Sequence, residues 1–311
     1  MTRTLVVAHD AGGAEVISAW IRREAASAPC DFLLEGPAVA IFERKLSLQT
    51  RVEREAAFAD IGGGAYGLVL TGSSWATDLE RSAVRAARGA GIRSVTYLDH
   101  WVRYPERFEI GGEHVLPDEL WAGDRHAVAL AREHLPDAHV RLVPNVYWDD
   151  VRAAIEAQPA PRGGERTLYV TEPTSRVAEA STGDPRGFGY DEREALRGYL
   201  DLADPAVPLR LRPHPAEEPG KYDDLLADRA ADRPAEVSNG HTLEQDIAWA
   251  TRVVGCDSMA MAIAVVAGRD VVCAIPPGGR PPSLPFPEIR RLYAERMGAD
   301  DLADHSSARS P

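Results

Sequence analysis

The sequence predicts an α/β protein with two parallel-sheet domains that face a cleft. Two observations predict this fold class. Short runs rich in Val and Leu alternate with stretches of about 10 to 15 residues that have helical spacing, which is typical of βαβ units. The alternation stops at the Pro- and Gly-rich stretch 158–166 and then restarts. Each half of the chain is therefore expected to form a sheet of its own.

The first half reads as alternating strands and helices. We expect strands within 4–10, 31–36, 67–73, 93–100, 119–123 and 140–145. We expect helices within 11–26, 77–91, 125–135 and 147–157. This order predicts a Rossmann-like domain over residues 1–157, followed by a linker at 158–166.

The second half repeats the pattern as a second Rossmann-like domain over 167–299. Strands are expected within 167–173, 208–215, 235–240, 252–258 and 269–277. Helices are expected within 191–203, 217–230, 242–250, 259–268 and, as the last helix, 287–299. The polar tail 300–311 is expected to be disordered.

Composition narrows the function classes. The chain has 311 residues and a formal net charge of -13, which argues against general nucleic-acid binding because that function needs a basic face. No stretch has the length of a transmembrane segment or the pattern of a secretory signal. Cys30, Cys256 and Cys273 lack the spacing of a disulfide framework or a zinc site. A cytoplasmic enzyme is expected, with the question of a homo-oligomer left open.

Ligands of open α/β sheets bind beyond the carboxyl ends of the strands, so the residues that follow each strand are the candidates for a ligand site. The first strand ends in His9 and Asp10, followed by Gly12 and Gly13, which allow a close backbone approach to a ligand. The alternative is a tight turn in which Asp10 caps the next helix.

Two more strands of the first half end in polar residues. Ser73 and Ser74 follow one strand and could contact an acceptor or a phosphate, although a plain loop is the favoured explanation. Asp99, His100 and Trp101 follow another strand, where a carboxylate or imidazole can act as a general base and an indole can stack on a sugar. The alternative is that Asp99 holds a neighbouring loop and Trp101 belongs to a core.

In the second half, Arg212 and His214 follow a strand, and prolines on both sides of His214 restrict its backbone. Asp257 and Ser258 follow a later strand and begin an apolar helix. A serine beside the N–H groups of a helix start can cradle a phosphate, and a rigid histidine can donate to it. Ordinary helix capping would also explain Asp257 and Ser258.

These features resemble GT-B-type glycosyltransferases, in particular the bacterial sialyltransferase, polysialyltransferase and capsule-polymer transferase group that uses CMP- or CDP-activated donors. In that group a His-Pro motif and a later Ser or Ser-Ser pair contact the donor phosphate. Here His214-Pro215 matches the first motif, and Asp257-Ser258 matches the second in part. The acidic-Gly motif that carries the base is absent, so Asp99 or Asp10 would replace it.

The resemblance implies a metal-independent glycosyltransferase with no cofactor beyond its nucleotide-sugar co-substrate and a hydroxyl acceptor. Asp99, His100 and His214 are the expected catalytic residues. The expected donor site consists of Arg212, His214, Asp257, Ser258, Met259 and Glu172. The expected acceptor side consists of His9, Asp10, Gly12, Gly13, Ser73, Ser74 and Trp101. Two alternatives remain: a UDP-sugar 2-epimerase-like enzyme, and a non-catalytic protein that binds a nucleotide or glycan.

Overall fold

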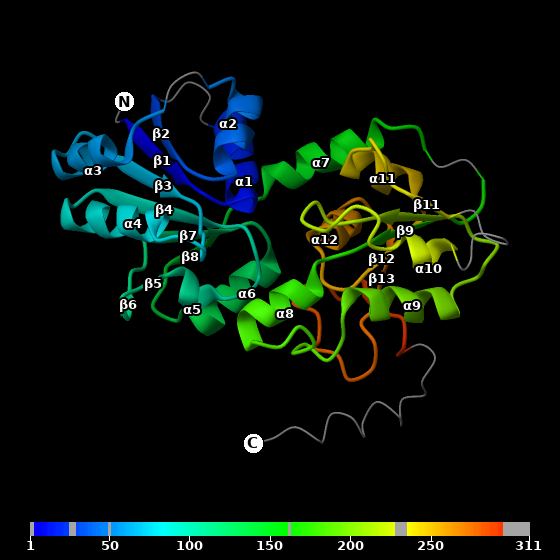
Figure 1. Cartoon of the computed structure of the whole chain (residues 1–311). Helices are drawn as coiled ribbons and strands as arrows, with labels where there is room; N and C mark the ends of the chain where they lie inside the picture. The colour runs from blue at the N-terminus through cyan, green and yellow to red at the C-terminus, as the bar shows by residue number, and fades with distance from the viewer. Residues whose placement is uncertain (1–2, 25–28, 49–50, 161–162, 228–234, 295–311) are drawn as a thin grey trace. The chain divides into compact units, whose positions relative to one another are not determined.

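The computed structural model describes residues 3–24, 29–48, 51–160, 163–227 and 235–294 (Figure 1). The chain divides into two compact units, Met1–Asp150 and Val151–Pro311. The division lies inside helix α7 (Val146–Glu156), a few residues before the expected boundary at 157, because this helix continues from one unit into the other. Part of the expected linker and the whole of the expected tail lie outside the described residues.

The first unit is built on a six-stranded parallel sheet with the order β2-β1-β3-β4-β7-β8. Its strands are β1 (Thr4–Ala8), β2 (Cys30–Leu34), β3 (Leu68–Thr71), β4 (Arg93–Leu98), β7 (Glu119–Ala122) and β8 (Val140–Leu142). Its helices before α7 are α1 (Ala11–Glu24), α2 (Ala38–Leu46), α3 (Arg54–Gly62), α4 (Leu79–Gly89), α5 (Tyr104–Arg107) and α6 (Arg125–His134).

The second unit also has a six-stranded parallel sheet, with the order β11-β10-β9-β12-β13-β14. Its strands are β9 (Thr167–Val170), β10 (Leu209–Arg212), β11 (Ala235–Val237), β12 (Arg252–Gly255), β13 (Asp270–Cys273) and β14 (Ile289–Arg291). Its helices after α7 are α8 (Thr174–Thr182), α9 (Glu192–Leu202), α10 (Asp223–Ala227), α11 (Leu243–Trp249) and α12 (Met259–Val266). The prediction of two Rossmann-like parallel-sheet domains is confirmed.

The apolar runs form strands because both of their faces are buried. In β1, Val6 and Ala8 enter one core with α1 and α2, while Leu5 and Val7 enter a second core with α3 and α4. Successive side chains of a strand point to opposite faces, so a continuous apolar run suits a sheet covered on both sides. Figure 1 shows α1 and α2 on one side of β1 and α3 and α4 on the other.

The prediction of a last helix over 287–299 is wrong in its described part, because Ile289–Arg291 forms strand β14. This strand pairs in parallel with β13, with Ile289 opposite Val271 and Arg291 opposite Cys273. Pairing along the open edge of β13 satisfies the backbone of this segment and outweighs its helical composition. The pattern also missed α2, α3, α5 and α8, and the antiparallel hairpin of β5 (Glu109–Ile110) and β6 (Glu113–His114). Among the described residues, the helices are too short or too polar to cross a membrane.

Candidate functional site

Each sheet has one place where consecutive connections leave in opposite directions. In the first unit this switch point lies between β1 and β3, and in the second unit it lies between β9 and β12. Ligands of doubly wound sheets bind beyond the carboxyl ends of the two strands at such a point. The residues that follow these strands are therefore the first candidates in each unit.

In the second unit, three side chains from neighbouring strands come together at the switch point. Glu172 follows β9, His214 follows β10 and Ser258 follows β12. The Ser258 hydroxyl lies close enough to the Glu172 carboxylate to lower its pKa, and Glu172 Oε2 lies 3.8 Å from His214 Nε2. This cluster unites three of the residues expected at the donor site, although long stretches of chain separate them in sequence.

Ser258 combines two roles. As the N-cap of α12, its Oγ accepts a hydrogen bond of 3.2 Å from Ala260 N–H. The capping alternative is thus present, and the same hydroxyl also reaches Glu172. The next backbone N–H, that of Met259, has no hydrogen-bond partner within the described part of the chain, so it can donate to a ligand.

The carboxyl group of Glu172 has an unusual environment. Its pKa is raised from the ordinary value of 4.5 to about 7. Burial has the largest effect and raises the pKa, the Ser258 hydroxyl lowers it, and the negative charges of Glu217 and Asp257 raise it. Glu172 can therefore hold or release a proton near neutral pH, as an acid–base group or a proton-donating ligand contact requires.

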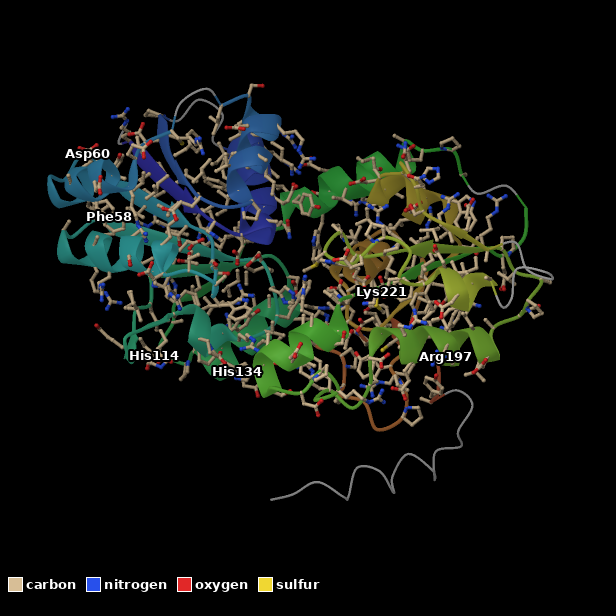
Figure 2. All side chains as sticks on the ribbon, in the orientation of Figure 1. Phe58, Asp60, His114, His134, Arg197 and Lys221 are labelled. Carbon is tan, nitrogen blue, oxygen red and sulfur yellow. The ribbon has the colours of Figure 1, made fainter. Side chains whose placement is uncertain are left out.

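His214 is held by a buried carboxylate three residues further along the chain. Glu217 Oε2 accepts a hydrogen bond of 2.9 Å from His214 N–H and another from the Thr171 hydroxyl. Its Oε1 accepts from Tyr222 Oη at 2.5 Å and pairs with Lys221 Nζ at 2.9 Å (Figure 2 labels Lys221). Burial alone would raise the pKa of Glu217, but these hydrogen bonds outweigh it and lower the pKa, so Glu217 stays ionised.

The His214 imidazole remains accessible, with 37% of its side chain exposed. Its Nδ1 accepts a hydrogen bond from Ala216 N–H at 3.1 Å, which leaves Nε2 to carry the hydrogen in the neutral ring. Burial lowers the pKa of His214, the charge of Glu217 raises it and the charge of Arg176 lowers it. Arg176, in the first turn of α8, is exposed and was missed in the sequence, although its place just after β9 is a usable signal.

Two residues expected to contact the donor are engaged elsewhere. Arg212 Nη1 lies 2.6 Å from the fully buried carboxylate of Asp246 and also donates to the carbonyl of His241. Asp257 Oδ1 accepts hydrogen bonds from the N–H and the hydroxyl of Ser283, at 2.8 and 3.0 Å. Arg212 therefore ties β10 to α11, and Asp257 anchors the loop after β13.

In the first unit, Asp99 lies in a closed polar cluster. Its Oδ1 accepts from Ser73 Oγ at 2.8 Å and pairs with Arg107 Nη1 at 3.3 Å. Its Oδ2 lies against the start of α1, where a Cβ added to Gly12 would be only 2.2 Å away. Because Gly12 has no side chain, the carboxylate of Asp99 can approach the start of α1. The sequence had instead predicted that this glycine allows a ligand to approach. Arg107 gave no signal in the sequence.

His9 and Asp10 form a pair after β1, with His9 Nδ1 2.7 Å from Asp10 Oδ1. The His9 N–H donates to Oε1 of Glu80 at 2.9 Å. Glu80 lies on α4 and is almost fully buried, and burial raises its pKa from 4.5 to about 7 despite the hydrogen bond from His9. The sequence did not single out Glu80, because a glutamate in a charged helix normally faces solvent.

The other expected residues of the first unit are packed inside it. Trp101 is buried and donates from Nε1 to Asp124 at 3.0 Å, so its indole belongs to the core rather than to an open wall. Burial lowers the pKa of His100, whose Nδ1 accepts from Trp101 N–H. Ser74 Oγ accepts from Ala76 N–H, and Gly13 approaches the Cα of Gly72.

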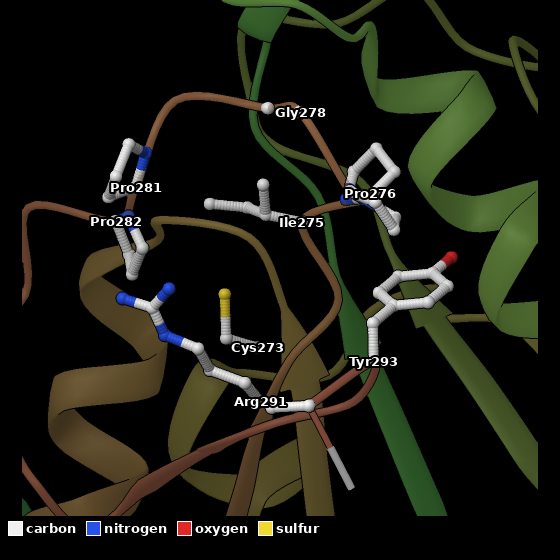
Figure 3. A pocket seen from close by; sticks show the side chains of 11 residues that line it. Cys273, Ile275, Pro276, Gly278, Pro281, Pro282, Arg291 and Tyr293 are labelled. Carbon is white, nitrogen blue, oxygen red and sulfur yellow. The ribbon is translucent and has the colours of Figure 1, made fainter. Parts of the chain in front are cut away.

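A cavity of about 130 Å³ lies at the carboxyl ends of β13 and β14 (Figure 3). Its walls are mostly apolar. Figure 3 shows the guanidinium of Arg291 near the sulfur of Cys273, with Pro281 and Pro282 on one side and Pro276 and Tyr293 on the other. The Ser283–Asp257 hydrogen bonds fasten the loop that forms one wall to the end of β12. None of the residues expected from the sequence lines this cavity.

Comparison with known proteins places the chain by fold. No family model matches the sequence, and no curated protein matches it. A putative UDP-N-acetylglucosamine 2-epimerase from Listeria monocytogenes is similar in structure, with a TM-score of 0.59 and 12% identity over 88% of this chain and 78% of that one. The UDP-GlcNAc 2-epimerase from Methanocaldococcus jannaschii gives a TM-score of 0.56 at 12% identity, over 87% of this chain and 83% of that one.

A third solved structure is similar to a comparable degree. MurG from Acinetobacter baumannii gives a TM-score of 0.53 at 12% identity, over 98% of this chain and 82% of that one. At such low identities these similarities show a shared fold of two Rossmann-like domains. The function has to be argued from the site.

Proposed function

We propose that the protein is a glycosyltransferase that moves a sugar from a nucleotide-activated donor, CMP- or CDP-linked by preference, to a hydroxyl of a glycan or small molecule. The observation that carries this proposal is the cluster of Glu172, His214 and Ser258 at the switch point of the second sheet. The shared fold with MurG and the 2-epimerases supports the proposal at the level of architecture alone.

In the proposed reaction, the acceptor oxygen forms a bond to the anomeric carbon of the donor while the bond from that carbon to the phosphate oxygen breaks. Arg176, His214 and the N–H of Met259 would stabilise the leaving phosphate, since cations and helix-start N–H groups favour anions. These groups can stabilise the charge without a metal ion.

The acceptor proton needs a base, and the candidates are the His9–Asp10 pair and Asp99. The His9–Asp10 pair is better suited than Asp99, because Asp99 is engaged by Ser73 and Arg107 and only 8% exposed. Asp10 would orient the imidazole through Nδ1 and leave His9 Nε2 to take the proton. Asp99 would then act by holding the start of α1.

The first experiment is calorimetric titration of the full chain with CMP, CDP, UDP and ADP. We expect micromolar binding of a cytidine nucleotide, weakened at least about tenfold, or about 1.4 kcal/mol, by His214→Ala. His241→Ala is the control, since this exposed histidine belongs to the same unit but lies beside Asp246. Absence of binding by all four nucleotides would refute the donor site.

A UDP-sugar 2-epimerase-like reaction is the second candidate. It is favoured by the pairing of Glu172 and His214, two proton-exchanging groups whose side-chain atoms lie 3.8 Å apart. Incubation with UDP-GlcNAc in D₂O and no acceptor tests it, because epimerisation would produce a new anomeric proton signal and exchange the proton at C2. Nucleotide binding without turnover in either assay would point to the non-catalytic alternative.

A further inference from the structure

The chemistry of Glu172 extends the proposed function. Glu172 lies between the two other members of the cluster, with His214 on the strand to one side and Ser258 on the strand to the other. If the proposed function is right, the ligand phosphate meets this carboxyl group. An ionised carboxylate at that position would repel the phosphate.

The surroundings of Glu172 do not neutralise it. Within the described part of the chain, neither Arg nor Lys forms an ion pair with its carboxylate, and the His214 ring, whose Nε2 lies 3.8 Å away, has a lowered pKa that favours its neutral form. The acids Glu217 and Asp257 face it from the loops after β10 and β12. The cation of Lys221 does not offset these charges at Glu172, because it pairs with Glu217 and Glu192.

We propose that Glu172 binds the ligand phosphate as a neutral carboxylic acid that donates a hydrogen bond, so that ligand binding is coupled to proton uptake. In the unliganded protein, the Ser258 hydroxyl favours the ionised form of the carboxyl group, because it lowers the pKa of Glu172. When Glu172 takes up a proton, that hydroxyl can rotate toward the ligand, because a serine O–H turns freely. Uptake of one proton therefore gives the ligand two hydrogen-bond donors, the Glu172 carboxyl group and the Ser258 hydroxyl, in place of the carboxylate acceptor.

The groups that titrate nearby allow this coupling to be isolated. The pKa of Glu172 is raised to about 7, whereas the pKa of His214 is lowered from 6.5 and that of Glu217 is lowered from 4.5. Arg176 acts on His214 as a positive charge, and Asp257, whose pKa is raised from 3.8, accepts hydrogen bonds from Ser283. A phosphate loses its second proton at about pH 6. Among these neighbouring groups, Glu172 is therefore the one whose protonation changes above about pH 7.

The test is calorimetry of the full chain with CDP, UDP and inorganic pyrophosphate between about pH 7 and 9, in two buffers of different ionisation enthalpy. For the wild type we expect proton uptake on binding and an affinity that falls at least about tenfold over this range. Glu172→Gln keeps a donor without a titrating proton, so its binding should take up no proton and should vary little with pH. Glu179→Gln, an exposed residue of α8, should behave as the wild type.

The outcomes separate this inference from the proposed function. Nucleotide binding without proton uptake, or with the same uptake in Glu172→Gln, overturns the role of Glu172 and leaves the donor site standing. Binding of pyrophosphate alone, with uptake that Glu172→Gln abolishes, supports the role of Glu172 and overturns the nucleotide-dependent function. Failure of both nucleotides and pyrophosphate to bind overturns both proposals.

Discussion

The carboxyl edges of the two sheets differ in how they use their polar side chains. In the first unit, Asp99 and Arg107 are 8% and 4% exposed and bond to each other and to Ser73. In the second unit, Glu172 and His214 are 27% and 37% exposed, and their closest side-chain atoms are 3.8 Å apart. Similar topology therefore carries a closed polar cluster in one unit and an open one in the other.

This difference separates structural from ligand-binding roles. A buried charge whose hydrogen bonds are all made within the protein stabilises the fold and has little capacity left for a ligand. A half-buried acid with a raised pKa and no cationic partner lowers the stability of the fold when it is ionised, and such groups are concentrated at functional sites. The four changes below test the contrast between the edges, from the largest expected effect to the smallest.

Breaking the closed cluster should have the largest effect. Arg107→Ala removes the guanidinium from Asp99 and leaves a buried carboxylate without its partner, which should lower the free energy of unfolding by about 3 to 5 kcal/mol. Urea denaturation followed by circular dichroism measures this loss. Arg85→Ala, an exposed residue of α4, should change it by no more than about 0.5 kcal/mol. Equal effects of the two variants would show that the cluster is not closed.

Glu80→Gln should stabilise the first unit at high pH. Because the folded state raises the pKa of Glu80 from 4.5 to about 7, the proton is held more tightly when folded, and stability is lost as pH rises through this range. Removing the titration should raise the free energy of unfolding at about pH 9 by about 3 kcal/mol and flatten its pH dependence. Denaturation at several pH values measures this. Glu55→Gln, an exposed glutamate of α3, is the control, and a matching pH dependence in wild type and Glu80→Gln contradicts the prediction.

Arg176→Ala tests the open edge of the second unit. The guanidinium lies close enough to His214 to lower the pKa of that imidazole, so its loss should weaken nucleotide binding about tenfold, or about 1.4 kcal/mol. The unfolding midpoint should hardly move, because Arg176 is exposed. Arg197→Ala on α9, labelled in Figure 2, removes an equivalent charge away from the cluster and should leave binding unchanged. Equal affinities of both variants would exclude Arg176 from the site.

Ser258→Ala should have the smallest effect on stability and a specific effect on Glu172. Loss of the N-cap of α12 should cost about 1 kcal/mol, and loss of the hydroxyl that stabilises the ionised carboxylate should raise the pKa of Glu172 further. Denaturation and a carbon-13 NMR titration of the carboxyl group measure the two effects. Thr242→Ala removes the capping box of α11 and should cost a similar amount without changing that pKa. An unchanged pKa in Ser258→Ala would mean that the hydroxyl does not act on Glu172.

Some features of the candidate site could be predicted because they are local in sequence. Prolines on both sides of His214 predict a rigid turn after a strand, and a serine at position 258, before an apolar helix, predicts a helix cap. Arg212 and Asp257 have the same local signature of a polar residue after a strand. Their partners, Asp246 and Ser283, lie far along the chain, so local pattern gave no means of telling a ligand contact from a structural one.

The alternation of apolar runs and helical stretches was sufficient for the fold class, because periodicity records which faces of a segment are buried. It was insufficient for the described part of the expected last helix, where Ile289–Arg291 pairs with the edge of β13 as a strand. The order of the strands then decided the chemistry. By placing β9 between β10 and β12, it brings Glu172 between His214 and Ser258. Burial sets the pKa of Glu172, and burial depends on neighbours that only the tertiary structure supplies.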